Sequence, residues 1–543
     1  MMVMHSCSEQ WLEEKPPHLI TTETLYSSYE GFQSGLNGLY ALVRGEREGP
    51  EGSSEALRVE LIMDGTDNMT PNHRSAFGQI AEDWTAKNTP FASDMTSMFD
   101  WLYQIINAAN TIIGHAENRT DIDWSGGANS DDENKNQVMA EAKALRAWAY
   151  RHLTYSWGDV PLNLEESLGS NIKTDWIRTP VIEVRNQMKS DWMFAEKHLN
   201  VEPSVRGKIS KGAVQHYLAE LYLTLNKPDS ALYWTNQCIN TPEYKLITER
   251  YGVKSNEPGV PFMDMFYDGN SNREEGNTEA LWVWQWEPET IGGGGSIMRR
   301  MFMTRYWDIS VGGVRPFEIT INRGGRGLGR MSLTKWAIDN YEAKDDRASN
   351  FAMRKYLILK DASGNAPFSA DKLPKGYQYG DTIHLNWNKD ISSTSKNRRD
   401  WPYIRKWDST PVFDVISSRQ YNDQVYLRLA ETYLLKAEAQ LLLGFPDEAA
   451  KTVNIIRQRA QASPVSAADI DIDFILDERS RELVGEEHRR YTLLRTGKWL
   501  ERVQLYNHNG GQNATQRDQL FPIPQSVIDA NLTGDMPQNP GFN

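Results

Sequence analysis

The sequence contains only two cysteines, Cys7 and Cys238, too few for the disulfide framework that stabilises small secreted domains. It also lacks an apolar run of the roughly 18 residues that a membrane-spanning helix needs. Positive charge is in deficit, because 59 lysines and arginines face 73 aspartates and glutamates, a formal net charge of −14. A nucleic-acid-binding surface needs a basic footprint, so this balance argues against a nucleic-acid partner.

The usual signatures of catalysis are also missing. The ten histidines form no His-x-x-x-His pair, so a zinc hydrolase site is not indicated. No Gly-x-Ser-x-Gly turn occurs, and the glycine runs at 292–295 and 324–327 are not followed by the Lys-Ser/Thr of a phosphate-binding loop. We therefore expect a protein that is not an enzyme and that carries no catalytic cofactor.

What the sequence does contain is a helical hairpin near the C-terminus. Apolar residues recur at three- and four-residue spacing over 427–441, which predicts a helix opening at Tyr426. Gly444 follows, at the place where a helix favours a left-handed residue at its end. Asp447 then suits the positive N-terminal end of a second helix. The turn between the two helices is therefore very short.

The same hairpin occurs earlier in the chain. Residues 219–232 align without a gap on residues 437–450, with Ala-Glu, Leu, Pro-Asp and Ala at matching positions and Asn226 where Gly444 stands. Small alanines allow two helices to approach closely, and hairpins of this composition are typical of tetratricopeptide-like repeats. The two copies lie far apart in the sequence, so they are not a plain tandem array.

The remaining patterns predict a mostly α-helical chain with an irregular middle. Helices are predicted over 21–44, 99–113, 140–155, 181–199 and 475–496. Glycine runs interrupt the middle, where alternation over 280–286 predicts one or two strands and at most a small β-hairpin. We divide the chain into a tether (1–20), a helical N-terminal part (21–250) and a C-terminal part (251–543) that contains the irregular middle (251–425) and the closing helices (426–500), all in one compact unit.

Six motifs, in this order, resemble those of the SusD/RagB family. Each is modest alone, but together they cover nearly the whole chain. They are Ala140 to Tyr150 running into Trp157-Gly158-Asp159-Val160-Pro161-Leu162; Arg428-Leu429-Ala430-Glu431 with Ala437-Glu438-Ala439; Asn454 to Ala460; Glu478 to Leu483; Phe521-Pro522-Ile523-Pro524; and Gln538-Asn539-Pro540-Gly541-Phe542.

The resemblance implies both a fold and a function. Members are surface lipoproteins of Bacteroidetes that cap a SusC-like, TonB-dependent outer-membrane transporter and bind its nutrient, most often a glycan. Their fold is a scaffold of tetratricopeptide-like helix pairs that carries an irregular ligand-binding half. We therefore expect a glycan-binding protein that delivers oligosaccharides or polysaccharides to the transporter without cleaving them. Two alternatives stay open: the same scaffold binding peptides or another nutrient, and an α-helical glycosidase.

The resemblance also implies a lipid anchor. In the family, the mature protein begins at a lipidated cysteine followed by a short acidic, proline-containing tether. Cys7 and the stretch from Ser8 to Pro17 fit this pattern, although only Met1 to Met4 and two further residues stand upstream. We expect Cys7 to anchor the protein to the outer membrane; a free thiol at the terminus is the alternative.

Two loop regions combine aromatic rings with polar side chains, as a sugar site requires. A sugar offers flat apolar faces for a Trp or Tyr ring and hydroxyl groups for Asp, Asn and Arg. If Trp282, Trp284 and Trp286 lie in a strand they share one face, which is either a binding surface or core. The residues we expect to contact the ligand are Asp67, Asn68, Asn72, Arg74 and Trp84 in the first region and Trp286, Arg305, Tyr306 and Trp307 in the second.

A charged helix after residue 475 admits two interpretations. Glu478, Glu482 and Glu486 follow one another at four-residue spacing, and glycosidases do use paired carboxylates. The same segment, however, alternates these carboxylates with five arginines. We favour an ion-pair network between packed helices over a catalytic site.

One loop has the spacing of a calcium site. Asp121, Asp123 and Ser125 precede Asp132, which stands at the twelfth position of an EF-hand-like loop. Asp132 replaces the usual bidentate glutamate. We therefore consider two alternatives: the loop binds a structural calcium ion, or it is a polar surface loop that matches the spacing by chance.

Overall fold

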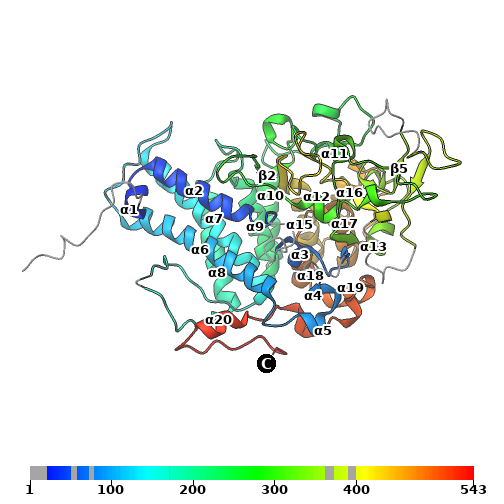
Figure 1. Ribbon diagram of the computed structural model, residues 1–543. Helices are drawn as coiled ribbons and strands as arrows, with labels where there is room; N and C mark the ends of the chain where they lie inside the picture. Colours follow the sequence, from blue (N-terminus) through cyan, green and yellow to red (C-terminus); the bar gives the residue numbers. More distant parts are fainter. Residues whose placement is uncertain are drawn as a thin grey trace, which may run out of the picture.

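The computed structural model describes residues 21–49, 58–72, 79–169, 171–360, 372–388 and 399–542. Its first half is built from long helices, of which α2, α6, α7 and α8 lie side by side (Figure 1). Within the described ranges, no helix is both long and apolar enough to cross a membrane. The helices of this half are α1 (Thr22–Leu25), α2 (Tyr29–Arg44), α6 (Ser93–Asn118), α7 (Asp131–Trp157), α8 (Val181–His198), α9 (Lys211–Thr224) and α10 (Pro228–Ile239).

Local chemistry explains where the central helix α7 begins and ends. Ser130 accepts a hydrogen bond from the backbone of Glu133, whose carboxylate in turn accepts one from the backbone of Ser130, which completes a capping box. The helix stops at Gly158, which has a φ of +73° that favours glycine. Between these ends, Trp148 and Trp157 are fully buried.

Both predicted hairpins are confirmed. The first is α9–α10; the second is α15 (Leu429–Leu442) followed by α16 (Pro446–Arg459). Asn226 and Gly444 have φ angles of +53° and +80°, so both occupy the left-handed region expected at these turns. Helix α10 packs against α15, so the two hairpins are neighbours in space although distant in the chain.

The predicted start of the second hairpin is wrong by three residues. Tyr426 belongs to strand β8 (Gln424–Arg428), which pairs antiparallel with β2 (Ala280–Trp284), and α15 begins only at Leu429. Strand β2 lies where alternation predicted one, but its partner comes from far along the chain rather than from a local hairpin. All five residues of β2 are buried, so Trp282 and Trp284 are core.

The rest of the chain alternates short helices with two-stranded sheets. The expected helix over 475–496 is interrupted at Gly485, which has a φ of +76°. The remaining helices are α3 (Arg58–Met63), α4 (Gln79–Glu82), α5 (Trp84–Lys87), α11 (Pro261–Asp264), α12 (Met298–Phe302), α13 (Lys335–Asp339), α17 (Ile472–Leu483), α18 (Arg489–Arg495), α19 (Trp499–Tyr506) and α20 (Gln525–Ala530). The 3₁₀ turns include η3 (Gly252–Lys254), η5 (Tyr306–Asp308), η6 (Ile321–Arg323) and η7 (Asp346–Ala348).

Three further strand pairs cross-link the irregular middle. They are β1 (Met69–Pro71) with β3 (Met331–Leu333), β4 (Met353–Arg354) with β7 (Tyr403–Ile404), and β5 (Tyr356–Ile358) with β6 (Thr382–His384). The largest hydrophobic cluster extends from Tyr26 through Trp284 to Ile523, so the helical part, strand β2 and the C-terminal segment share one core.

Candidate ligand-binding site

Three of the polar residues expected to bind ligand after α3, Asp67, Asn68 and Asn72, are buried instead. The carboxylate of Asp67 accepts hydrogen bonds from Arg489 and Arg502 at 2.6 to 2.8 Å. Burial opposes ionisation of this carboxyl, but the two guanidinium groups outweigh it and lower its pKa. Asn68 accepts from the hydroxyl of Ser480, and Asn72 donates to the carbonyl of Gly329 at 2.8 Å. Asp67 and Asn68 thus attach the loop to the closing helices, and Asn72 attaches it to the irregular middle. All three side chains are buried, so they do not form an exposed binding surface.

Trp84 is core as well, which corrects a second expectation. Only 2 % of its surface is exposed. Its ring meets Trp499 edge to face with centroids 5.4 Å apart, and the guanidinium of Arg490 lies 5.4 Å from its centroid. Arg74 lies outside the described residues, so its predicted ligand contact stays a prediction.

Two more predicted contacts are buried in the second region. Trp286 is covered, with Arg44 5.8 Å from its ring centroid. Tyr306 donates its hydroxyl hydrogen to the carbonyl of Gly325 at 2.7 Å and is fully buried. Of the nine residues expected to contact ligand, only Arg305 and Trp307 are both described and partly exposed.

Trp307 lies among guanidinium groups. Its indole N–H donates to the carbonyl of Gly327 at 3.2 Å, and Arg305 and Arg326 lie 4.8 and 5.4 Å from its ring centroid. The glycines at 324 and 325, with φ angles of +87° and +83°, form the sharp turn that brings Arg326 to the ring. A half-buried ring beside fixed donors suits a ligand with both apolar faces and hydroxyl groups.

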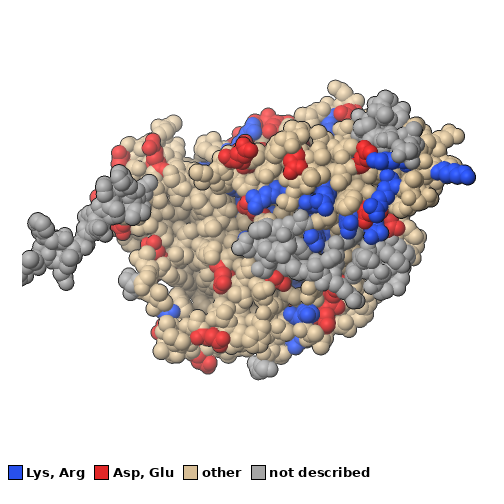
Figure 2. Space-filling model, in the orientation of Figure 1, with Lys and Arg blue, Asp and Glu red and all other residues tan. Residues whose placement is uncertain are grey.

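Asp308, the next residue, is paired with several arginines. Its carboxylate lies 3.0 to 3.2 Å from the guanidinium nitrogens of Arg305, Arg315 and Arg399, so one negative charge faces three positive ones. Figure 2 shows Lys and Arg side chains gathering over the irregular half, while the helical half in this view displays mainly Asp and Glu. We call the surface formed by Arg305, Trp307, Asp308, Arg315, Arg326 and Arg399 the Trp307 face.

The irregular half contains an aromatic pair and a cavity that no sequence pattern predicted. The exposed ring of Phe413 lies with its centroid 5.9 Å from that of the partly buried Tyr421. A cavity of about 610 Å³ is lined by residues from five separate segments, among them Arg323 and Tyr356. No periodic pattern marks these residues, because they meet only through contacts between distant segments of the chain.

The loop with EF-hand spacing does not assemble a cation cage. Asp121 accepts two hydrogen bonds from the guanidinium of Arg119, at 2.8 and 2.9 Å. An oxygen of Asp123 accepts from the backbone and hydroxyl of Ser125, and Asp132 lies in the first turn of α7. The three carboxylates are not close enough to share an ion, so this geometry does not support the calcium hypothesis.

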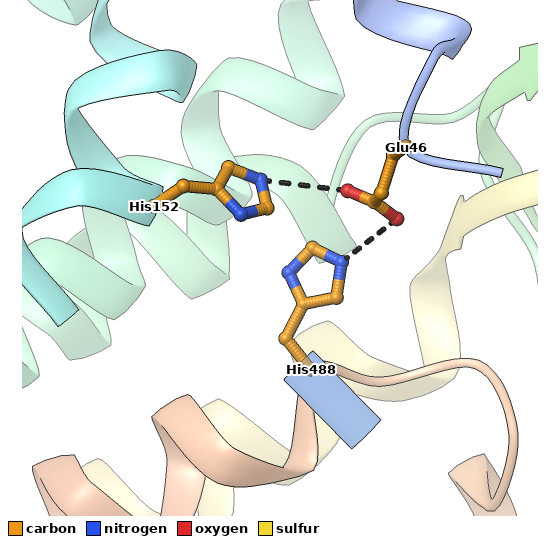
Figure 3. Close-up of side chains that lie close together, drawn as sticks. All are labelled: Glu46, His152 and His488. Carbon is orange, nitrogen blue, oxygen red and sulfur yellow. Dashed lines mark hydrogen bonds and ion pairs between the residues drawn. The ribbon is translucent and has the colours of Figure 1, made fainter. Parts of the chain in front are cut away.

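Within the described part of the chain, the one compact group of possible metal ligands is Glu46, His152 and His488 (Figure 3). It is buried, and Arg151 donates to Nδ1 of His488 at 2.7 Å. His488 therefore carries its proton on Nε2, which lies 3.3 Å from Glu46, and that nitrogen has no lone pair for a metal. Burial lowers the pKa of His152 well below its usual value and keeps the ring neutral. We interpret the group as a hydrogen-bonded core cluster.

The charged helix α17 confirms the ion-pair interpretation. The buried carboxylate of Glu482 is paired with three buried guanidinium groups, those of Arg347, Arg428 and Arg459. Burial favours the neutral form of Glu482, but the three positive charges outweigh it and hold its pKa well below the usual range. A carboxylate held ionised and covered in this way cannot act as a general acid on a substrate.

Comparisons with known proteins cover both halves of the chain. Residues 278–542 match the family model described as "SusD family", and residues 10–223 match one described as "Starch-binding associating with outer membrane". Two SusD-like proteins of Formosa agariphila are each 26% identical to this chain; the alignments cover 97% and 100% of it and 94% and 98% of the relatives.

Solved structures share the fold. A structure described as a laminarin binding SusD-like protein matches with a TM-score of 0.68 and 21% identity, over 95% of this chain and 100% of the other. The surface glycan-binding protein A of Bacteroides thetaiotaomicron, in complex with laminarihexaose, matches with a TM-score of 0.69 and 18% identity, over 94% and 99% of the two chains.

Proposed function

Since the chain belongs to the SusD/RagB family, we propose that it captures oligosaccharides or polysaccharides at the outer-membrane surface and passes them to a SusC-like, TonB-dependent transporter. The family model for the N-terminal part, with its description of starch binding and outer-membrane association, supports this proposal. So do the structural neighbours whose names include laminarin or a bound laminarihexaose.

The observation that carries the proposal is the Trp307 face. The tryptophans of the helical scaffold, such as Trp101, Trp148 and Trp157, are buried in its core. Trp307, by contrast, is partly exposed and lies beside the guanidinium groups of Arg305, which is paired with Asp308, and Arg326. Ring and donors together match the apolar face and hydroxyl edge of a sugar.

Binding takes place without bond cleavage in this proposal. The carboxylates that could have formed a catalytic pair, Glu478 and Glu482, are buried and paired with arginines. Purified protein incubated with a broad polysaccharide panel is expected to release no reducing ends. Release of sugar by the purified protein would overturn this part of the proposal.

The test of the ligand site begins with a glycan array and a peptide panel run in parallel, which separates sugars from other nutrients. The best oligosaccharide is then titrated calorimetrically into wild-type protein, Trp307→Ala and Trp176→Ala. Trp176 is the matched control because it is also half-buried but belongs to the helical half. An aromatic contact is worth about 1 kcal/mol, so Trp307→Ala should weaken binding several-fold.

The control should bind like the wild type, and both variants should melt at nearly the wild-type temperature. Normal affinity in Trp307→Ala, or equal losses in the two variants, would exclude the Trp307 face as the sugar site. Binding of peptides but no glycans would favour the other nutrient class.

Membrane attachment is proposed to occur through Cys7, which lies outside the described residues. A single acyl chain holds a protein only marginally, so two or more chains are expected on this residue. Cys7→Ala, expressed behind a complete signal sequence, should leave the membrane fraction. If the variant stays there, the anchor lies elsewhere.

A further inference from the structure

The irregular half also contains a cavity whose lining includes no residue of the Trp307 face. It encloses about 610 Å³ and is lined by η3, the segment after α11, η6, strand β5 and the end of β7. Labels α11 and β5 mark this part of the molecule in Figure 1. This volume falls within the range of small-ligand sites. We call it the Arg323 pocket.

The lining of the Arg323 pocket is strongly cationic. Five positive side chains face a single carboxylate, that of Glu257; the five are Lys254, Arg323, Arg354, Lys360 and Arg405. Asp408 offsets part of this charge, because it lies 2.9 Å from Arg405 and 3.9 Å from Arg354. Across the described ranges, Lys254, Arg323 and Lys360 have no carboxylate within ion-pair distance. Although the chain has a net charge of −14, the pocket therefore has an excess of positive charge that is not paired with carboxylates.

Arg323 is the most unusual of these cations. Its Nε and Nη2 are buried and have no hydrogen-bond partner among the residues that the structure describes. Its closest aromatic neighbour is Phe317, whose ring centroid lies 5.0 Å from the guanidinium carbon. Burial lowers its pKa, which means that the charged form is already partly stripped of water. Arg323 as a whole is partly buried, and Glu318 acts on its charge only from beyond ion-pair distance. Covering a charge without an ion-pair partner is costly, and an anionic ligand would offset this cost.

The backbone explains why the guanidinium stays in place. Arg323 ends the 3₁₀ turn η6, and the next residue, Gly324, adopts the left-handed conformation with a φ of +87°. A Cβ at Gly324 would approach the side chain of Met303 to 2.6 Å, so the turn depends on this glycine. The turn holds Arg323 at the pocket and, three residues later, Arg326 at the Trp307 face.

Rings and an amide complete the lining of the pocket. Tyr267 and Tyr356 are half-exposed there, and Lys254 lies 4.5 Å from the ring centroid of Tyr267. The side-chain oxygen of Asn350 already accepts hydrogen bonds from the backbones of Lys355 and Tyr356. Its amide N–H groups make no hydrogen bond to any described residue, and they remain available as donors. Rings and neutral donors suit a sugar rather than a bare ion.

We propose that the Arg323 pocket binds the carboxylate or sulfate group of an acidic sugar residue. The guanidinium of Arg323 offers forked donors that match two oxyanion oxygens, and Lys254 and Lys360 add point charges. The proposal rests on the proposed function only in taking a sugar as the ligand. It assigns to this protein an anionic glycan, bearing uronic acid or sulfate groups, as the preferred class.

The test uses matched small probes, so that it does not depend on knowing the natural glycan. Glucuronate is compared with glucose, galactose 6-sulfate with galactose, and inorganic sulfate serves as the bare anion, each titrated calorimetrically at low ionic strength. Each acidic sugar should bind at least tenfold more tightly than its neutral counterpart and more tightly than inorganic sulfate. Added salt should weaken the binding.

Two variants locate the binding. Arg323→Met removes the charge at similar length and should abolish measurable binding of both acidic sugars. Lys451→Met removes a lysine of α16 that belongs to neither site and is 71 % exposed at its side chain, and it should leave the binding of both acidic sugars unchanged. Lys254→Met, at an exposed lysine of the same pocket, should weaken binding severalfold and serves if Arg323→Met fails to fold.

Several results would overturn the proposal: equal binding of acidic and neutral sugars, no binding of either acidic sugar, equal binding of inorganic sulfate, or undiminished binding in the pocket variants. These failures are separable from failure of the proposed function. A neutral oligosaccharide that binds through Trp307, in protein that ignores both acidic sugars, would refute the Arg323 pocket alone. Acidic-sugar binding that depends on Arg323, in protein whose oligosaccharide affinity is unchanged by Trp307→Ala, would refute only the placement at the Trp307 face.

Discussion

Arginine has opposite roles in two regions of this protein. Beneath the closing helices, Arg347 is fully buried and lies within 3.0 Å of oxygens from Asp345, Glu478 and Glu482. In the irregular half, Arg323 is also largely covered but has no carboxylate partner among the described residues. Burial alone therefore does not reveal what an arginine does. An arginine that is paired with carboxylates stabilises the fold, whereas we propose that an arginine without such a partner binds a ligand.

Removing a carboxylate from the buried ion-pair network around Glu482 should cause the largest loss of stability. Glu482→Ala leaves three buried guanidinium groups without their shared partner, and breaking a buried pair costs on the order of 3–5 kcal/mol. We expect a loss of this size in the free energy of unfolding, measured by urea denaturation. Glu448→Ala, which breaks an exposed pair with Lys451, should leave the free energy of unfolding close to the wild-type value, because exposed ion pairs contribute little. Native stability of Glu482→Ala together with lost ligand binding would reverse the assignment.

Trp84→Ala tests the same distinction for an aromatic residue. Because Trp84 fills the space between Trp499 and Arg490, its truncation should cost about 3 kcal/mol of unfolding free energy or slightly more. Affinity measured on the folded fraction should stay at the wild-type value. A stable variant with weakened sugar binding would show that Trp84 belongs to the binding site after all.

Acid should weaken the paired network before it affects the cationic pocket. Burial raises the pKa of Glu220 and Glu478, but their arginine partners outweigh it and lower each pKa to about 2 from an ordinary 4.5. A lowered folded-state pKa means that the stabilisation is present above about pH 4.5 and is lost as pH falls towards 2. Each carboxyl contributes on the order of 3 kcal/mol across this window.

Urea midpoints measured between pH 7 and pH 2 should therefore fall steeply below about pH 4.5. In Glu220→Gln the profile should be shallower, because one titrating carboxyl is gone. A midpoint that stays constant down to pH 3 would contradict the network as a source of stability.

The smallest change in the free energy of unfolding is expected on replacing Arg323. This result would distinguish Arg323 most clearly from the paired arginines. Replacing an unpaired, partly dehydrated cation by Met removes no ion pair, so Arg323→Met should leave the free energy of unfolding within about 1 kcal/mol of wild type, or raise it. Arg347→Met should lose about 3–5 kcal/mol in the same assay. Equal losses in the two variants would mean that Arg323 is structural.

Sequence reasoning succeeded where the information was local. The hairpin turns at Asn226 and Gly444 and the interruption of the middle by glycine follow from the conformational preferences of single residues. The ion pairs around Glu482 followed from the regular alternation of opposite charges, which needs partners when it is buried. The opening of α15 at Leu429 rather than Tyr426 was missed because strand β8 exists only through its distant partner β2.

The ligand site was predicted poorly for the same physical reason. Asp67 and Trp84 have loop-like surroundings in sequence, yet Arg489 and Trp499 cover them from more than 400 residues away. A polar loop residue looks the same whether it faces water or a guanidinium from another segment. The Arg323 pocket was invisible because five short segments form it, each without a pattern of its own.

The pairing of β2 with β8 bears on how such proteins diverge. The two strands hold both ends of the stretch from 285 to 423, so an insertion or deletion in one of its exposed loops changes the length of a segment that remains closed at both ends. Loop closure becomes costlier by only about 0.6 kcal/mol for each doubling in length. Mutation can therefore lengthen or shorten these loops over generations while Val283 stays opposite Val425, so ligand preference can change on an inherited scaffold.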